Sequence, residues 1–191
     1  METENKIIKL FVSEKEPKTI REISKRIKAD YKITYTAAKR LLDKKILLGK
    51  EVGKSILCSL SDSYYGSEIY CAENKRKEEL LKNKNVSLMY KEIIKNTGSA
   101  FFIFILFGSY AKGKETANSD IDILIISNEK EIENKVNEAL SLMPLKTHAL
   151  FFSEEEFIRM KDSKKSNVVK EAIENNIILY GIENYYKLKN D

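Results

Sequence analysis

FGSYAKGKETANSDIDILII, residues 107–126, connects two apolar runs of the chain, at 100–107 and at 121–126. The part of the first run at 101–107 is unbroken, as expected for a strand that is covered on both faces. We therefore expect this stretch to hold the end of one central strand, a turn and the start of a second strand. A third strand is expected at 146–152.

The turn and the second strand carry polar residues that suit phosphate and metal binding. Gly108 lacks a side chain where a ligand could approach, and Ser109 offers a hydroxyl and backbone N–H groups at the start of a short helix. Asp120 and Asp122 are two residues apart on a strand, so their carboxylates point to the same face. A divalent cation is a common reason to keep two like charges together, and oxygen ligands with room for phosphates suit Mg²⁺. We expect both aspartates to lie at the mouth of a cleft, within reach of Ser109.

The spacing of these residues resembles the signature of a known enzyme family. Gly108-Ser109, ten intervening residues and Asp120-x-Asp122 resemble the polymerase β-like nucleotidyltransferase superfamily. The flank at 110–113, Tyr-Ala-Lys-Gly, is similar to its minimal nucleotidyltransferase branch. The resemblance covers roughly residues 86–157, with a weaker similarity to the C-terminus.

This resemblance implies a fold, a reaction and the residues that perform it. The fold is α/β (α+β) with a small mixed sheet. The reaction transfers a nucleotide from an NTP, ATP among them, to a hydroxyl group on a protein, a nucleic acid or a small molecule, with Mg²⁺ as cofactor. Asp120, Asp122 and Ser109 are the implied catalytic residues. The two aspartates hold the metal, and Gly108, Ser109 and Lys112 bind the nucleotide.

The third strand departs from the family pattern. Active members of the superfamily carry a third carboxylate there, whereas this strand reads KTHALFF and has no acidic residue. His148 is the only residue in it that could accept a proton near neutral pH. It is either a base or an ordinary hydrogen-bonded strand residue. The pattern therefore favours binding of NTP and Mg²⁺ and leaves turnover open.

Composition limits the class of protein. With 191 residues, 42% hydrophobic and 33% charged, the chain has room for one large or two small globular domains. Its longest apolar run, at 100–107, is too short to span a bilayer, and the N-terminal sequence does not have the pattern of a signal peptide. We expect a cytoplasmic protein. Two cysteines, Cys58 and Cys71, and a single histidine are too few for a disulfide framework or a zinc cluster.

The basic charge is concentrated at the N-terminal end. Residues 1–60 carry 15 Lys and Arg against 8 Asp and Glu, a balance of +7, whereas residues 61–191 carry 19 against 21, a balance of −2. This asymmetry favours a polyanion-binding module in front of a near-neutral domain. We expect an N-terminal module at 1–60, a helical connector at 61–85 and the nucleotidyltransferase-like domain at 86–191.

The pattern of the N-terminal module indicates three helices followed by a β-hairpin, which resembles the winged helix-turn-helix family. Thr19 and Glu22 form a capping box at the start of the second helix, and the third helix is expected to start near Thr34. The resemblance implies that the third helix enters the major groove of duplex DNA and that the hairpin forms the wing. The implied DNA contacts are Thr34, Tyr35, Thr36, Lys39 and Arg40 on the helix and Lys54 on the wing. Alternatively, the module serves dimerisation or packing.

Two functions of different classes follow from these patterns. The first is an enzyme that transfers nucleotides. The second is a DNA-binding transcriptional regulator whose nucleotidyltransferase-like domain is a sensor or a dimerisation unit. Minimal nucleotidyltransferases also occur in toxin–antitoxin pairs, so a protein partner is a third possibility. Near the C-terminus, Val169, Ile173 and Ile177 predict one final helix, which ends at 179–181.

Overall fold

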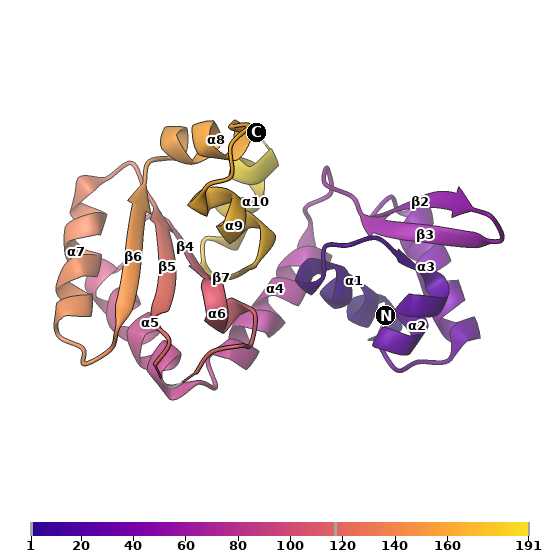
Figure 1. Cartoon of the computed structure of the whole chain (residues 1–191), viewed down its shortest axis with the longest axis horizontal. Helices are drawn as coiled ribbons and strands as arrows, with labels where there is room; N and C mark the ends of the chain where they lie inside the picture. Colours follow the sequence, from indigo (N-terminus) through magenta and orange to yellow (C-terminus); the bar gives the residue numbers. More distant parts are fainter. Residues whose placement is uncertain (1, 117, 191) are drawn as a thin grey trace. The chain divides into compact units, whose positions relative to one another are not determined.

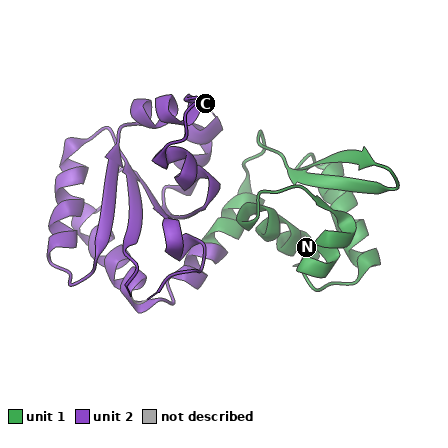
Figure 2. Ribbon diagram, in the orientation of Figure 1, with its two compact units in different colours: residues 1–74 green, residues 75–191 purple. Residues whose placement is uncertain are grey.

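The computed structural model of the chain describes residues 2–116 and 118–190. It has a mixed α+β architecture with two separate sheets, as the sequence predicts (Figure 1). The chain divides into two compact units, residues 1–74 and 75–191, which Figure 2 distinguishes by colour. Within the described residues, no helix combines the length and the apolar character needed to cross a membrane.

The first unit consists of helices followed by a hairpin, with a short extra strand. Its elements are α1 (Glu2–Ser13), β1 (Lys18–Thr19), α2 (Ile20–Arg26), α3 (Tyr31–Asp43), β2 (Leu47–Val52) and β3 (Ser55–Leu60). The three strands form an antiparallel sheet in the order β1-β3-β2. Apolar side chains from the three helices and the sheet fill the core, among them Ile7, Phe11, Ile23, Leu41 and Leu47.

Side-chain caps fix the starts of two helices in this unit. The capping box of Thr19 and Glu22 is present at the start of α2, as predicted. The prediction for α3 is wrong by three residues, because the Asp30 side chain accepts hydrogen bonds from two backbone N–H groups and starts the helix at Tyr31. Thr34 therefore lies inside the first turn, fully buried, with its hydroxyl bonded to the Asp30 carbonyl at 2.8 Å. The prediction of Thr34 as a DNA contact is thus wrong.

The second unit is built around a four-stranded sheet. Helix α4 (Ser67–Leu80) spans the boundary between the units and leads to α5 (Lys84–Thr97). The remaining elements are β4 (Ile103–Phe107), α6 (Gly108–Ala111), β5 (Ile121–Ile126), α7 (Lys130–Ser141), β6 (Thr147–Phe152), α8 (Glu154–Asp162), α9 (Val168–Glu174), β7 (Asn176–Tyr180) and α10 (Ile182–Asn190). The strand order is β6-β5-β4-β7. Strand β5 runs parallel to β6 and β4 runs antiparallel to both neighbours, so the sheet is mixed, as predicted.

Strand β4 is covered on both faces. All five of its residues are buried, which confirms the interpretation of the unbroken apolar run. On one face, Phe104 and Leu106 pack in one cluster with apolar side chains of α5 and α7, among them Met89 and Val136. Helices α9 and α10 contact β4 as well. The motif between β4 and β5 therefore begins and ends at well-anchored strands.

The C-terminal segment corrects one prediction. The expected single helix through Ile177 is wrong, because α9 ends at Glu174 and β7 follows as the edge strand beside β4. The buried side chain of Asn176 donates hydrogen bonds to the Ala172 carbonyl at 2.7 Å and to the Tyr185 hydroxyl at 2.8 Å. These bonds tie the end of α9 to α10 and turn the chain into the strand.

Candidate functional site

The turn between β4 and α6 brings Gly108 against a carboxylate. Phe107, the last residue of β4, is paired with Asp122 across the antiparallel strands. Gly108 has a φ of +70°, a conformation that residues with a side chain rarely adopt. A Cβ atom at Gly108 would overlap Oδ2 of Asp122 and lie 3.0 Å from its Cγ. Glycine is therefore required here both by backbone conformation and by the space that the Asp122 carboxylate occupies.

The other predicted residues of this motif lie around the same turn. Ser109 is half-buried in α6, directly after Gly108. Asp120 is exposed and precedes β5 by one residue. Lys112 follows α6, and its Nζ atom lies 3.3 Å from Oε1 of Glu171 on α9. The structure thus places Gly108 and Asp122 in direct contact and engages Lys112 in an exposed ion pair.

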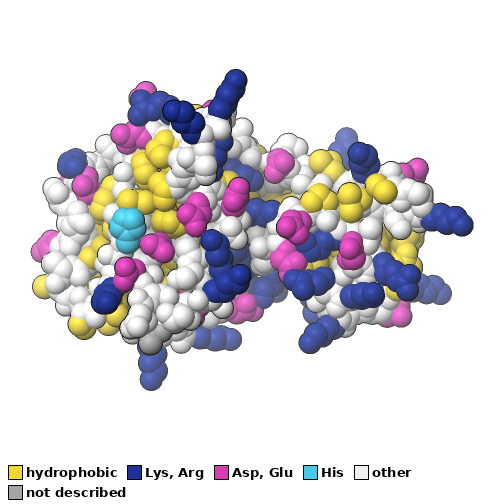
Figure 3. Space-filling model, viewed as in Figure 1, with side chains coloured by type: hydrophobic (Ala, Val, Ile, Leu, Met, Phe, Trp, Pro, Cys, Tyr) yellow, Lys and Arg dark blue, Asp and Glu magenta, His cyan; other side chains and the backbone are white. Residues whose placement is uncertain are grey.

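His148 lies beside Asp122. The two residues are register partners in the parallel pair β5 and β6. The Nδ1 atom of His148 lies 3.5 Å from Oδ1 of Asp122, and their side chains are 61% and 28% exposed. Figure 3 shows the histidine in cyan on the open surface, bordered by acidic and hydrophobic side chains. An exposed imidazole next to a carboxylate can exchange protons or ligands with solvent, which a buried strand residue cannot do.

Comparison with known proteins decides the family of the second unit. The family model described as "Polymerase beta, Nucleotidyltransferase" matches residues 89–185, about half of the chain. The chain belongs to this family. A search of curated proteins and a search of solved structures each returned no match. The matched range extends through β7 to Tyr185, so it includes the strand that the sequence patterns missed.

Nucleotidyltransferases of this family typically use a divalent metal, and the residues at the turn fit such an ion. Glycine at position 108 leaves room for the Asp122 carboxylate. Asp120, two residues earlier in the sequence than Asp122, is exposed to solvent. A hard cation such as Mg²⁺ needs only one or two carboxylates, because it keeps waters and takes substrate phosphates as further ligands. Among the described residues, no three His, Cys, Asp or Glu side chains are grouped as a ready ligand set. Asp120 and Asp122 together as metal ligands remain a prediction.

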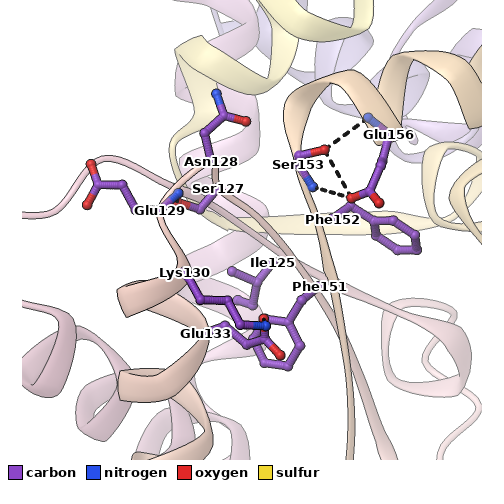
Figure 4. Close-up of a pocket in the computed structure, with 10 residues that line it drawn as sticks. All are labelled: Ile125, Ser127, Asn128, Glu129, Lys130, Glu133, Phe151, Phe152, Ser153 and Glu156. Atoms are coloured by element: carbon purple, nitrogen blue, oxygen red, sulfur yellow. Dashed lines mark hydrogen bonds and ion pairs between the residues drawn. The ribbon is translucent and has the colours of Figure 1, made fainter.

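A separate cavity lies at the other end of the central strands of the nucleotidyltransferase domain. It has a volume of about 230 Å³ and is lined by the residues labelled in Figure 4, which follow or end β5 and β6 or belong to α7 and α8. Its polar side chains bond to one another, since Glu156 accepts from Ser153 and Lys130 pairs with Glu133. None of the motif residues lines it. We therefore assign the functional site to the turn at Gly108 and not to this cavity.

The first unit has a groove of its own, with a volume of about 620 Å³. It lies between α2, the N-terminal part of α3 and the hairpin, and is lined by Thr19, Ile20, Arg21, Ser24, Lys25, Tyr31, Tyr35, Lys54, Ser55 and Ile56. Two predicted DNA contacts, Tyr35 and Lys54, are thus brought together. Sequence reasoning missed Arg21, Lys25 and Tyr31. Their spacing was a usable signal, because Arg21 with Lys25 and Tyr31 with Tyr35 are four residues apart on helices and share a face.

The remaining predicted DNA contacts lie along α3 outside this lining. Thr36 is exposed, with its hydroxyl bonded to the Lys32 carbonyl at 3.0 Å. The Lys39 Nζ atom lies 5.8 Å from the centre of the Tyr35 ring, within the range of a cation–π contact. Arg40 is exposed but lies 3.5 Å from the Glu4 carboxylate on α1, which offsets part of its charge.

Proposed function

We propose that the protein transfers a nucleotide from an NTP to a hydroxyl acceptor in a Mg²⁺-dependent reaction. The observation that carries this proposal is the contact of Gly108 with Asp122, at the junction of two buried strands, in a chain of the nucleotidyltransferase family. A glycine turn beside a carboxylate offers backbone N–H groups to phosphates and oxygen ligands to a cation in one place.

Each residue of the motif has a role in the proposed reaction. The hydroxyl of Ser109 and the backbone N–H groups after Gly108 hold the β- and γ-phosphates. Asp120 and Asp122 hold Mg²⁺, which when bound neutralises charge on the phosphate oxygens. The acceptor hydroxyl loses its proton to water, and its oxygen forms a bond to the α-phosphorus. The bond from this phosphorus to the bridging oxygen breaks, and pyrophosphate leaves with the electron pair. Lys112 adds positive charge near the leaving group once it releases Glu171.

Label transfer tests this proposal. The full chain is incubated with each α-labelled NTP, Mg²⁺ and a cell extract that supplies protein, nucleic acid and small-molecule hydroxyls. We expect labelled product from at least one NTP, lost in Asp122→Ala and retained in Glu115→Ala, which removes an exposed carboxylate of the same loop. Transfer that persists unchanged in Asp122→Ala contradicts the proposal.

We propose further that the first unit is a winged helix-turn-helix that binds duplex DNA. The order of its elements and the strand order β1-β3-β2, with β2 and β3 as the wing, support this assignment. The groove between α2, α3 and the wing supports the choice of ligand. It carries Arg21, Lys25 and Lys54, and the described residues that line it include no acidic side chain.

Two kinds of contact make this groove suitable for DNA. The basic side chains neutralise phosphates, which supplies most of the affinity and makes binding weaken with salt. Tyr31 and Tyr35 are 52% and 39% exposed, with ring centres 6.2 Å apart, and offer planar surface and hydroxyls to base edges. Such exposure of two neighbouring aromatic rings is costly in water and is expected where a partner covers them.

The salt dependence of DNA binding tests the second proposal. Lys25→Ala and Lys54→Ala in the full chain should each weaken binding to all duplex sequences and flatten the slope of log affinity on log salt by about 0.9 per lost phosphate contact. Lys39→Ala should act in the same direction, and Arg40→Ala less so because Glu4 already pairs with it. Lys6→Ala, on α1 and outside the groove, is the control. An unchanged slope in both groove variants contradicts the proposal.

A further inference from the structure

His148 and Asp122 form a pair of potential ligands with different chemistry. They lie on neighbouring parallel strands at the same register, so backbone hydrogen bonds of the sheet fix the separation of their Cα atoms. Both side chains reach solvent, and the imidazole is the more exposed. The separation of 3.5 Å between Nδ1 and Oδ1 exceeds the roughly 2.7–3.2 Å of a hydrogen bond.

We propose that His148 supplies a nitrogen ligand to the divalent cation held by Asp122, and that the site therefore favours Mn²⁺ over Mg²⁺. The proposal rests on the proposed function only in taking Asp122 as a metal ligand. The preference for Mn²⁺ goes beyond the proposed function, because it comes from the imidazole of His148 and not from the family motif.

The separation of the two atoms suits a shared ion. Nitrogen and oxygen ligands lie about 2.0–2.2 Å from a small divalent cation. Two adjacent ligands of an octahedral ion subtend an angle near 90° and are separated by about 3.0 Å, so the observed 3.5 Å has to shorten by only about 0.5 Å. One ion can therefore contact Nδ1 of His148 and Oδ1 of Asp122 with little movement of either side chain. Waters and phosphate oxygens complete the shell on the exposed side.

The chemistry of the ligands sets the preference. Mg²⁺ takes oxygen ligands and demands near-ideal octahedral geometry, whereas first-row transition metals accept imidazole nitrogen and follow a rising order of affinity that begins with Mn²⁺. The ratio of Mn²⁺ affinity to Mg²⁺ affinity is therefore higher for a site with one imidazole and one carboxylate than for a site with oxygen ligands alone. Replacing His148 by aspartate should convert it to an oxygen site.

The chain offers a direct spectroscopic test, because His148 is its only histidine. The untagged full chain is loaded with Mn²⁺ and inorganic pyrophosphate, the product common to every NTP, and the electron spin echo of Mn²⁺ is recorded for nitrogen modulation. We expect imidazole ¹⁴N modulation that changes to a ¹⁵N pattern after selective labelling of histidine. It should vanish in His148→Gln, whose exposed position makes the substitution compatible with folding.

Affinity measurements provide the second arm. His148→Gln should bind Mn²⁺ at least about tenfold more weakly, with a smaller change for Mg²⁺. His148→Asp should lower the ratio of Mn²⁺ to Mg²⁺ affinity. Bound Mn²⁺ that depends on Asp122 but shows no histidine modulation overturns this inference and leaves the proposed nucleotidyl transfer intact. Mn²⁺ binding that does not depend on Asp122 overturns both.

Discussion

Replacing Gly108 by alanine is the sharpest perturbation of the turn, because it adds one carbon atom at the contact with Asp122. The new Cβ overlaps Oδ2 and lies 3.0 Å from Cγ, whereas ordinary contact starts at 3.4 Å, so the whole carboxylate must retreat. The backbone conformation at φ +70° costs a further ~1–2 kcal/mol for a residue with a side chain. A misplacement on the order of 1 Å can cost on the order of 100-fold in a reaction.

The matched control is Gly113→Ala in the same segment. Gly113 has a φ of +61° but nothing lies within 4 Å of its Cβ position, so it carries the backbone cost alone. Urea unfolding should show a destabilisation of about 1–2 kcal/mol in Gly113→Ala and a larger one in Gly108→Ala, which must also displace the Asp122 carboxylate. Label transfer should fall on the order of 100-fold in Gly108→Ala only. Equal transfer in the two variants would refute the claim that the glycine makes room for a working carboxylate.

Two further predictions concern stability. Asn176→Ala removes a buried donor from two oxygen atoms and should lower the free energy of unfolding by about 1–3 kcal/mol in urea, with exposed Asn184→Ala as a neutral control. Hydrogen bonds from the Ser153 backbone N–H and hydroxyl lower the pKa of Glu156 below 4.5, so its stabilising contribution is complete above pH 4.5 and is lost as pH falls through the lowered value. As pH falls below 4.5, the free energy of unfolding of Glu156→Gln should therefore decrease less than that of wild type or of Glu155→Gln. The same decrease in all three proteins would contradict this.

Local patterns in the sequence predicted much of the fold. Strands β4, β5 and β6 were predicted at 100–107, 121–126 and 146–152, and the capping box at Thr19 predicted the start of α2. Gly108 and Asp122 were recognised because the family motif fixes their spacing. These features depend on residues close to one another in the chain, which sequence patterns describe well.

Features that depend on distant residues could not be predicted. Strand β7 carries apolar residues that fit both a helix and a strand, and its pairing with β4 decides between them. His148 meets Asp122 only through the register of β5 and β6, which no local pattern specifies. The start of α3 at Tyr31 was missed, although Asp30 directly before it caps the helix. That error placed buried Thr34 among the DNA contacts.

The most direct test of the central claim is whether the binding of NTP depends on Mg²⁺ and on the two aspartates, Asp120 and Asp122, that are proposed to hold it. Equilibrium binding of each NTP is measured with and without Mg²⁺ for wild type, Asp120→Ala, Asp122→Ala and Glu115→Ala. The account predicts that Mg²⁺ strengthens binding in wild type and in Glu115→Ala, and that either aspartate variant loses most of this gain because Mg²⁺ relies on one or two carboxylates. Equal Mg²⁺-dependent binding in all four proteins would contradict it.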